Sequence, residues 1–276
     1  GDTRFLLGPE YSMLREEFWR VPLRTARREC GNVLVMLGGD DPHGLMPGIL
    51  HELDALPGSF TVTAVIGPFF ASRDALTEAT GRWRRRVRLV QAPASVLELM
   101  MGADLAVSAG GQTLYELARV GCPVVAIRTA ANQTGQVEAF VQAGVIQSAG
   151  RAEDPAILQS IRDAAGSLLA DHRVRAAMSA AGRRLVDGQG AIRVAEELLR
   201  VNGAPSSYGQ ARLRPAEPED ARLLWQWASD PEVRRQAFRS EEIPWDAHAA
   251  WYAAKLQDAR CLLSILEMPD GTPVGQ

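Results

Sequence analysis

The chain has 276 residues, a formal net charge of −3 at pH 7, 46% hydrophobic residues and 23% charged residues. These values are typical of a globular protein, and the length allows one large domain or two smaller ones. The mild acidic excess gives no reason to expect a nucleic-acid partner. No apolar run approaches the ~20 residues of a membrane helix, and the N-terminal sequence lacks a secretory signal, so we expect a cytoplasmic protein without a membrane partner.

The first 30 residues precede the regular pattern of the chain. They begin with the strand-like stretch "RFLL" (residues 4–7), which has no earlier strand or helix to pack on. We therefore assign residues 1–30 to an interdomain strand and linker region, and we expect further chain before Gly1 in the natural protein.

From residue 31 to about residue 202, short apolar runs alternate with helical patterns. The runs are continuous and rich in valine, which is typical of strands buried on both faces. Strands that alternate with helices form a parallel sheet with right-handed crossovers, so we predict an α/β, Rossmann-like domain over residues 31–202. The predicted strands are residues 32–37, 60–66, 86–90, 104–108 and 123–127, and the predicted helices are residues 95–103, 113–121, 155–169, 173–186 and 191–201.

Two other features of this domain favour ordinary structural roles. The basic run "RWRRRVR" (residues 82–88) joins a helix end to the third predicted strand, and we predict that it is solvated surface. The three cysteines, Cys30, Cys122 and Cys261, form no CxxC pair. That pattern argues against a disulfide framework or a zinc cluster and fits a reducing compartment, so we expect no metal site.

The composition changes after residue 202. Residues 203–210 ("GAPSSYGQ") have the composition of a linker. Residues 211–276 then predict a strand, a turn and a helix that starts near Pro218, and the last residues resemble the middle of a hairpin. A segment of about 65 residues is small for an independent core, so we expect the natural chain to continue beyond Gln276.

Two glycine pairs follow predicted strands, where an open parallel sheet binds its ligands. Gly38 and Gly39 lie in "LGGDDP", and Gly110 and Gly111 lie in "SAGGQT". Glycine lets a ligand approach the backbone closely, and the first amides of a following helix carry a partial positive charge. Both loops therefore suit a phosphate or diphosphate. Neither matches the P-loop or the GxGxxG fingerprint, so the pattern alone is a weak indication.

Thr113 and Glu116 allow two interpretations. As T-x-x-E they form a capping box, in which each side chain accepts a hydrogen bond from the other residue's amide. Alternatively, Glu116 accepts hydrogen bonds from the vicinal hydroxyls of a sugar. The residues by themselves leave both interpretations open.

Three more side chains fall at the same predicted edge. Asn132 and Gln133 open the helix after the fifth strand. Asn132 is either an N-cap or an amide that binds a sugar or phosphate oxygen. His43 is either a surface residue in the first turn of a helix or a general acid or base.

These stretches together resemble one enzyme family. Residues 5 to about 201 resemble the C-terminal half of the nucleotide-sugar hydrolase of pseudaminic acid biosynthesis, which acts on UDP-2,4-diacetamido-2,4,6-trideoxy-β-L-altropyranose. The resemblance implies the two-domain GT-B fold, whose C-terminal domain holds the UDP. The stretches that carry it are "FLLGPEYSMLREEF", "VLVMLGGDDP", "DLAVSAGGQTLYELARVGCPVVAI", "ANQ" and "DGQGAIRV".

The resemblance also implies roles for individual residues. In the GT-B group a GGxTxxE-type segment cradles the diphosphate, and its glutamate, Glu116 here, binds the ribose. The implied contacts are Gly110, Gly111, Gln112 and Thr113 with the diphosphate, Gly38 and Gly39 near the phosphates, Val90, Gln91 and Ala92 near the uracil, and Asn132 and Gln133 near the sugar.

The implied reaction is hydrolysis of a UDP-linked 2,4-diacetamido sugar to free sugar and UDP, without a cofactor. In the family the catalytic histidine and the sugar-binding groove belong largely to an N-terminal domain that this sequence does not contain. The catalytic residue is therefore unknown here, and His43 is the one candidate. Two alternatives stay open: a GT-B glycosyltransferase that acts on a UDP-sugar, and a nucleotide-sugar module that only binds.

Residues 211–276 resemble a different family, the start of a GNAT-type N-acetyltransferase. The stretches that carry this resemblance are "RLRPAEPEDA", "WASDPEVRRQAF", the spaced residues Trp245, His248, Trp251 and Tyr252, and "GTPVGQ". The resemblance implies a bifunctional parent protein and acetyl-CoA as the cofactor of a complete acetyltransferase. The glycine-rich turn that holds acetyl-CoA in such folds is absent from this sequence.

Overall fold

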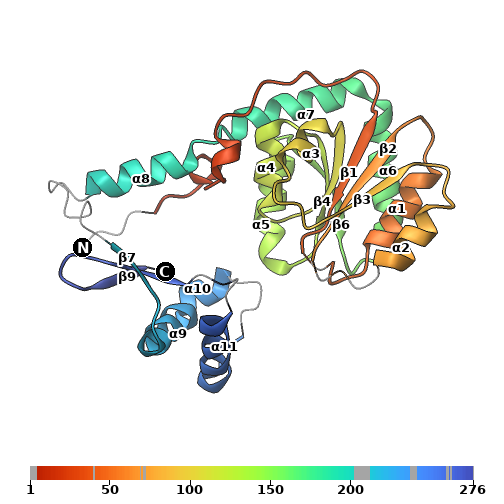
Figure 1. Ribbon diagram of the computed structural model, residues 1–276. Helices are drawn as coiled ribbons and strands as arrows, with labels where there is room; N and C mark the ends of the chain where they lie inside the picture. The colour runs from red at the N-terminus through yellow and green to blue at the C-terminus, as the bar shows by residue number, and fades with distance from the viewer. Residues whose placement is uncertain are drawn as a thin grey trace. The chain divides into compact units, whose positions relative to one another are not determined.

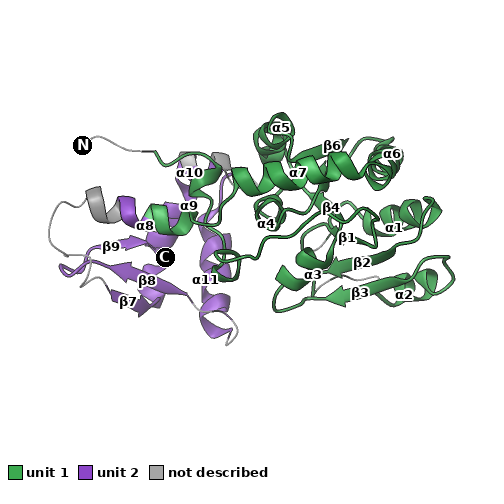
Figure 2. Cartoon of the chain, turned by 90° about the horizontal axis from the view of Figure 1, so that it is seen from above, with its two compact units in different colours: residues 1–194 green, residues 195–276 purple. Residues whose placement is uncertain are grey.

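The computed structural model describes residues 5–39, 41–68, 70, 73–201, 212–236, 241–258, 261 and 263–275. The chain forms two compact units, residues 1–194 and residues 195–276 (Figure 2). The predicted linker at residues 203–210 lies outside the described residues. Each unit has its own sheet and its own buried core.

Unit 1 is built on a six-stranded parallel sheet in the order β3-β2-β1-β4-β5-β6. The prediction of an α/β, Rossmann-like sheet is therefore confirmed, and each of the five predicted strands lies within one residue of its expected bounds. The sixth strand was not predicted, because "IQSAGR" is small and polar and lies at the edge of the sheet. The strands are β1 (Asn32–Met36), β2 (Thr61–Ile66), β3 (Val87–Gln91), β4 (Leu105–Ala109), β5 (Val124–Arg128) and β6 (Ile146–Arg151).

Helices cover both faces of this sheet (Figure 1). Successive strand residues point to opposite faces. Val33 and Val35 accordingly join the core under α1, α2 and α6, whereas Leu34 and Met36 join the core under α3, α4 and α5. The helices cover the faces and leave the ends of the strands as the place where a ligand can reach the sheet. The helices are α1 (Met46–Ala55), α2 (Arg73–Thr80), α3 (Leu97–Gly102), α4 (Thr113–Val120), α5 (Thr134–Gln142) and α6 (Ile157–Ala170).

The strand register brings three loops to one edge. Met36 of β1 pairs with Ser108 of β4, and Ala109 of β4 pairs with Ile127 of β5. Because all the strands are parallel, the loops that follow β1, β4 and β5 leave the sheet from neighbouring points. Both predicted glycine loops and the turn before α5 therefore lie at the carboxyl edge of the sheet.

The N-terminal residues differ from the prediction. Phe5 to Leu7 form no strand, and Phe5 is 71% exposed; Arg4 lies outside the described residues. Residues 9–19, which we call the N-terminal strap, form two short 3-10 helices, η1 (Pro9–Tyr11) and η2 (Glu16–Phe18). Phe18 is fully buried in the core under α3, α4 and α5. The strap is thus packed onto unit 1, against Gly190 at the start of α8 (Gly190–Val201). Another helix of this unit, α7 (His172–Leu185), packs against α4.

The opposite, amino-terminal edge of the sheet holds a pocket of about 410 Å³ lined by the basic run and by residues before β1 and β2. The prediction that the whole run is solvated was wrong for Arg85, which is 8% exposed. Its guanidinium donates to the carbonyls of Leu53 (2.8 Å), Gly58 (2.9 Å) and Leu56, and it lies 3.7 Å from the ring centroid of Phe60. Arg85 therefore satisfies carbonyls at the end of α1.

Unit 2 is small and has an antiparallel sheet in the order β7-β8-β9. The predicted strand, turn and helix are present, as is the predicted hairpin at the end of the chain, although Gln276 lies outside the described residues. Arg214 cross-links the unit, because its guanidinium pairs with both Asp220 and Glu267. The elements are β7 (Arg212–Pro215), η5 (Pro218–Asp220), α9 (Ala221–Ser229), α10 (Pro231–Gln236), α11 (Trp245–Gln257), β8 (Ser264–Glu267) and β9 (Pro273–Gly275).

Among the described residues, no helix combines the length and the apolar character that crossing a membrane would require.

The position of Arg85 generates a stability prediction. Arg85→Met should lower the free energy of unfolding by about 2–4 kcal/mol, because several buried carbonyls lose their donor and Phe60 loses the stacked guanidinium. Arg86→Met is the matched control, since Arg86 belongs to the same run and is exposed. It should change stability by no more than about 0.5 kcal/mol. Urea unfolding followed by circular dichroism measures both, and equal effects would contradict a buried capping role for Arg85.

Candidate functional site

Gly110 closes the strand ladder at the end of β4. Its amide donates to the carbonyl of Ile127 at 2.8 Å, and the residue is buried. A Cβ at this position would lie 2.6 Å from Cγ2 of Val137 and 3.0 Å from Oε1 of Gln133. Glycine is therefore required here for the close approach of α5, and the Gly110 amide is already engaged.

The next three amides are different. Among the described residues, the amides of Gly111, Gln112 and Thr113 donate to no other protein atom. A Cβ on Gly111 would meet only Nε2 of Gln133, at an ordinary 3.8 Å. Gln112 is exposed, and its neighbours Gly111 and Thr113 are half-buried. The first turn of α4 thus presents three consecutive donors at the carboxyl edge, which is the geometry of an anion site.

The capping-box interpretation of Thr113 and Glu116 was wrong. The N-cap of α4 is Gln112, and its side chain makes no capping hydrogen bond. Glu116 turns away from its own helix end, and its Oε1 lies 3.1 Å from Nη2 of Arg15. At the other end, Gly121 has a left-handed conformation (φ 72°) and closes α4.

Arg15 belongs to the N-terminal strap, which is fixed to unit 1 on two sides. Arg119 of α4 donates to the carbonyls of Phe18 (2.8 Å) and Trp19 (2.9 Å). On the other side, the backbone of Ser12 lies so close to Gly190 that a Cβ there would be 2.1 Å from the Ser12 carbonyl oxygen. The strap is therefore one wall of the site.

The environment of Glu116 is partly desolvated. Its side chain is 12% exposed, and burial raises the pKa of the carboxyl, while the charge and hydrogen bond of Arg15 lower it. Glu17 of the strap is also near and raises the Glu116 pKa further. A buried carboxylate needs hydrogen-bond donors. Any group that replaces or joins Arg15 at Glu116 must therefore supply such donors.

The first glycine loop lies at the same edge but is organised differently. Gly38 (φ 88°) and Gly39 are exposed, and a Cβ on Gly67 would overlap the Gly39 carbonyl, so the turn after β2 presses on this loop. The carboxylate of Asp41 accepts from the amides of Leu45 (3.0 Å) and Met46 (2.7 Å) at the start of α1. The Asp41 carboxylate thus already occupies the start of α1. This loop therefore offers a phosphate fewer free amides than the first turn of α4 does.

The structure separates Asn132 from Gln133. Gln133 is buried, and its Oε1 accepts from the amide of Thr129 at 2.9 Å, so its side chain holds the turn after β5. Asn132 is exposed in η3 (Ala131–Gln133). It caps no helix, because the N-cap residues are Ala130 for η3 and Gln133 for α5.

The residues expected near a uracil lie at the end of β3. Val90 is half-buried, whereas Gln91 and Ala92 are exposed. The amide of Ala92 donates to the carbonyl of Ile66 at 2.9 Å, and Ala92 has a positive φ of 42°. This strained alanine fixes the path of the chain towards α3, on the same edge of the sheet as the first turn of α4.

The interpretation of His43 as a residue in the first turn of a helix was wrong, because α1 begins only at Met46. Asp41 takes the helix start, and His43 lies in the preceding turn. Its Nε2 is 3.0 Å from the carbonyl oxygen of Thr129, and its ring is exposed. The contact with Thr129 gives His43 a structural partner across the loops that follow β1 and β5.

Among the described residues, no group of three or more His, Cys, Asp or Glu side chains is arranged to hold a metal ion. The buried cysteines Cys30 and Cys122 precede β1 and β5, so they lie at the opposite, amino-terminal edge of the sheet. Burial raises the pKa of Cys30 to about 11 and of Cys122 to about 12, so both thiols stay protonated at neutral pH.

Sequence reasoning missed Arg15 and Gly67. Arg15 is 101 positions from Glu116, and no local spacing connects the two. The one available signal was the conjunction of an arginine and two glutamates in "LREEF". Gly67 could have been found only from the strand-end position of "IGP", which places a glycine beside the first loop.

Two curated proteins are similar in sequence to this chain. No protein-family model matches it. Spore coat polysaccharide biosynthesis protein SpsG of Bacillus subtilis is 29% identical over 201 residues, which cover 70% of this chain and 58% of that protein. Uncharacterized protein MJ1062 of Methanocaldococcus jannaschii is 23% identical over 263 residues, which cover 92% of this chain and 50% of that protein. The chain thus spans between half and three fifths of the length of these curated relatives.

A solved structure supports the fold. The S. aureus MnaA–UDP co-structure matches with a TM-score of 0.52 at 18% sequence identity, over 64% of this chain and 48% of that chain. At this identity the likeness concerns the fold alone, and it fits a Rossmann-like unit of the GT-B type.

Neighbouring glycines should respond differently to the same substitution. Gly110→Ala should lower the free energy of unfolding by about 1–3 kcal/mol, because the new methyl group overpacks against Val137 and Gln133. Gly111→Ala should change it by less than about 0.5 kcal/mol, since its methyl group finds only an ordinary contact. Thermal or urea unfolding of the two variants measures the difference. Equal losses would contradict the assignment of packing to Gly110 and open space to Gly111.

Proposed function

We propose that unit 1 binds the UDP portion of a nucleotide sugar at the carboxyl edge of its sheet. The observation that carries this proposal is the first turn of α4, where three unengaged amides stand one helical turn before the paired carboxylate of Glu116. The amides of Gly111, Gln112 and Thr113 receive the diphosphate, helped by the helix dipole. Glu116 accepts hydrogen bonds from the ribose hydroxyls.

The remaining assignments follow the resemblance and the positions of the loops. We propose that the end of β3, at Val90, Gln91 and Ala92, receives the uracil. Gly38 and Gly39 approach the phosphates through exposed backbone. Asn132 is the exposed amide near the sugar, whereas Gln133 acts through the turn that it holds.

We propose hydrolysis as the reaction of the whole protein. Water attacks the anomeric carbon of a UDP-linked 2,4-diacetamido-trideoxy sugar, the bond from that carbon to the diphosphate oxygen breaks, and free sugar and UDP are released. The amides of the α4 turn stabilise the charge that develops on the departing diphosphate. We expect the group that takes the proton from water to lie outside this chain, as the family resemblance implies.

Transfer to an acceptor other than water is a second candidate. It is favoured by the relative from Bacillus subtilis, whose name places it in polysaccharide biosynthesis. Both reactions use this unit for the nucleotide. Incubation of the full-length protein with the UDP-sugar alone separates them, since release of free sugar without an acceptor supports hydrolysis and its absence supports transfer.

For unit 2 we propose kinship with GNAT-type N-acetyltransferases. The support is the sequence resemblance together with an order of strand, helices and antiparallel strands that is compatible with it. A parent protein with both activities would act in the cytoplasm on an amino sugar and its nucleotide-linked product, with acetyl-CoA as the acetyl donor.

UDP should bind to the chain at least about tenfold more tightly than UMP, because the α4 turn addresses the second phosphate with charge-assisted hydrogen bonds. Isothermal titration calorimetry at constant ionic strength measures both affinities, and uridine serves as the phosphate-free reference. Equal affinities for UDP and UMP would remove the diphosphate from this turn.

Glu116→Gln should weaken UDP binding by roughly tenfold without lowering the melting temperature. The pKa of Glu116 is raised in the folded protein, so its ionised form costs the fold stability above its unfolded pKa, and this cost vanishes at lower pH. A neutral amide removes the cost at neutral pH. Calorimetry and thermal unfolding test the pair of effects. A large loss of stability with unchanged UDP affinity would make Glu116 a purely structural residue.

A further inference from the structure

We propose that Arg15 of the N-terminal strap is a further ligand-contacting residue of this site and sets its preference for a diphosphate. Its guanidinium pairs with Glu116 in this structure and passes to the diphosphate when a nucleotide binds. This inference rests on the proposed function of unit 1 and adds to it a phosphate-binding cation that lies outside the glycine loops.

The pairing of Glu116 is replaceable by a nucleotide. Glu116 is 12% exposed on its side chain, and Arg15 is its donor, at 3.1 Å. The two hydroxyls of a ribose are donors as well. When they reach Glu116, the carboxylate keeps its hydrogen bonds and the guanidinium becomes free to move.

Arg15 combines a fixed backbone with a movable head. The residues around it are anchored, since Leu14 is 5% exposed and Phe18 is fully buried. The Arg15 side chain, in contrast, is 51% exposed, and Nη1 also lies 3.1 Å from Oε1 of Glu17. The guanidinium can therefore change partners without any rearrangement of the strap.

The strap also places this cation beside the three free amides. Nε2 of Gln112 lies 3.4 Å from Oγ of Ser12, so the strap touches the turn itself. Gln112 and Glu116 are one helical turn apart, or about 6 Å along the axis of α4. A diphosphate on the amides is thus within reach of an arginine that now pairs with Glu116.

The negative charges at the site oppose the binding of a diphosphate unless a cation offsets them. A diphosphate that binds the α4 turn comes close to Glu116, and through the strap to Glu17, and both carboxylates repel it. The helix start supplies only about half a unit of positive charge. A guanidinium supplies a full charge and a planar pair of donors that fits phosphate oxygens. Arg15 therefore favours UDP over ligands that have no phosphate.

The test compares UDP with uridine for the unchanged chain and for Arg15→Gln. We expect UDP affinity to fall about tenfold in Arg15→Gln, while uridine affinity stays within about twofold, because Glu116 remains available to the ribose. Arg86→Gln is the matched control, since it removes one exposed arginine at the opposite edge of the sheet. Arg15→Lys, which keeps the charge but loses the planar donors, should give an intermediate loss for UDP. NMR titration measures all affinities.

Two outcomes overturn the inference, and they are distinguishable. If Arg15→Gln weakens the binding of UDP and of uridine by the same factor, or weakens the binding of neither, Arg15 does not contact phosphate. The proposed UDP site still stands in that case. If the unchanged chain binds no UDP, the proposed function fails and the inference fails with it. Thermal unfolding verifies that the variants are folded, and Arg15→Lys supplies the same comparison if Arg15→Gln does not fold.

Discussion

The burial of both faces of one parallel sheet is the constraint on which the rest of unit 1 depends. Alternate residues of β1 and its neighbours serve two separate cores, so helices must cover both faces. The ends of the strands stay open. Because the strands are parallel, their carboxyl ends and the helix starts that follow them meet at one edge, where unpaired amides and positive helix dipoles gather.

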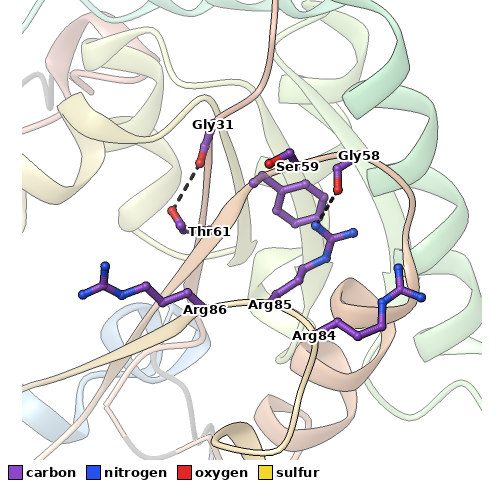
Figure 3. A pocket seen from close by; sticks show the side chains of 8 residues that line it. Gly31, Gly58, Ser59, Thr61, Arg84, Arg85 and Arg86 are labelled. Atoms are coloured by element: carbon purple, nitrogen blue, oxygen red, sulfur yellow. Dashed lines mark hydrogen bonds between the residues drawn. The ribbon is translucent and has the colours of Figure 1, made fainter.

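The two edges use their polar groups for different purposes. At the amino-terminal edge, Asp104 accepts from the amides of Gly31 and Asn32, and Arg85 donates to carbonyls at the end of α1. Figure 3 shows Arg84 and Arg86 extending in opposite directions from Arg85, so the three arginines do not converge on one ligand. Polar groups there stabilise the fold. At the carboxyl edge, the amides of Gly111, Gln112 and Thr113 donate to no protein atom within the described part of the chain.

The N-terminal strap determines the partner of the Glu116 side chain. As part of an isolated helix, Glu116 would close its own helix start. In the folded protein the strap brings a guanidinium to it from 101 positions away, and a pair between two elements replaces the local cap. In this ion pair Glu116 is largely buried and Arg15 is half-exposed, so Arg15 can exchange Glu116 for another partner. A capping box could not do so without exposing the helix start.

The sequence by itself determined the period and order of the elements, since valine-rich runs and helical patterns report burial directly. It therefore predicted the sheet, five strands and the two glycine loops. It left the role of Glu116 open between a helix cap and a ligand contact, it misjudged Arg85 and the residues before η1, and it missed β6. Their states depend on partners distant in sequence or on an edge position with weak patterning. Only the tertiary structure decided which glycine packs against α5, which amides stay free and which cation faces Glu116, because long-range contacts leave no local spacing.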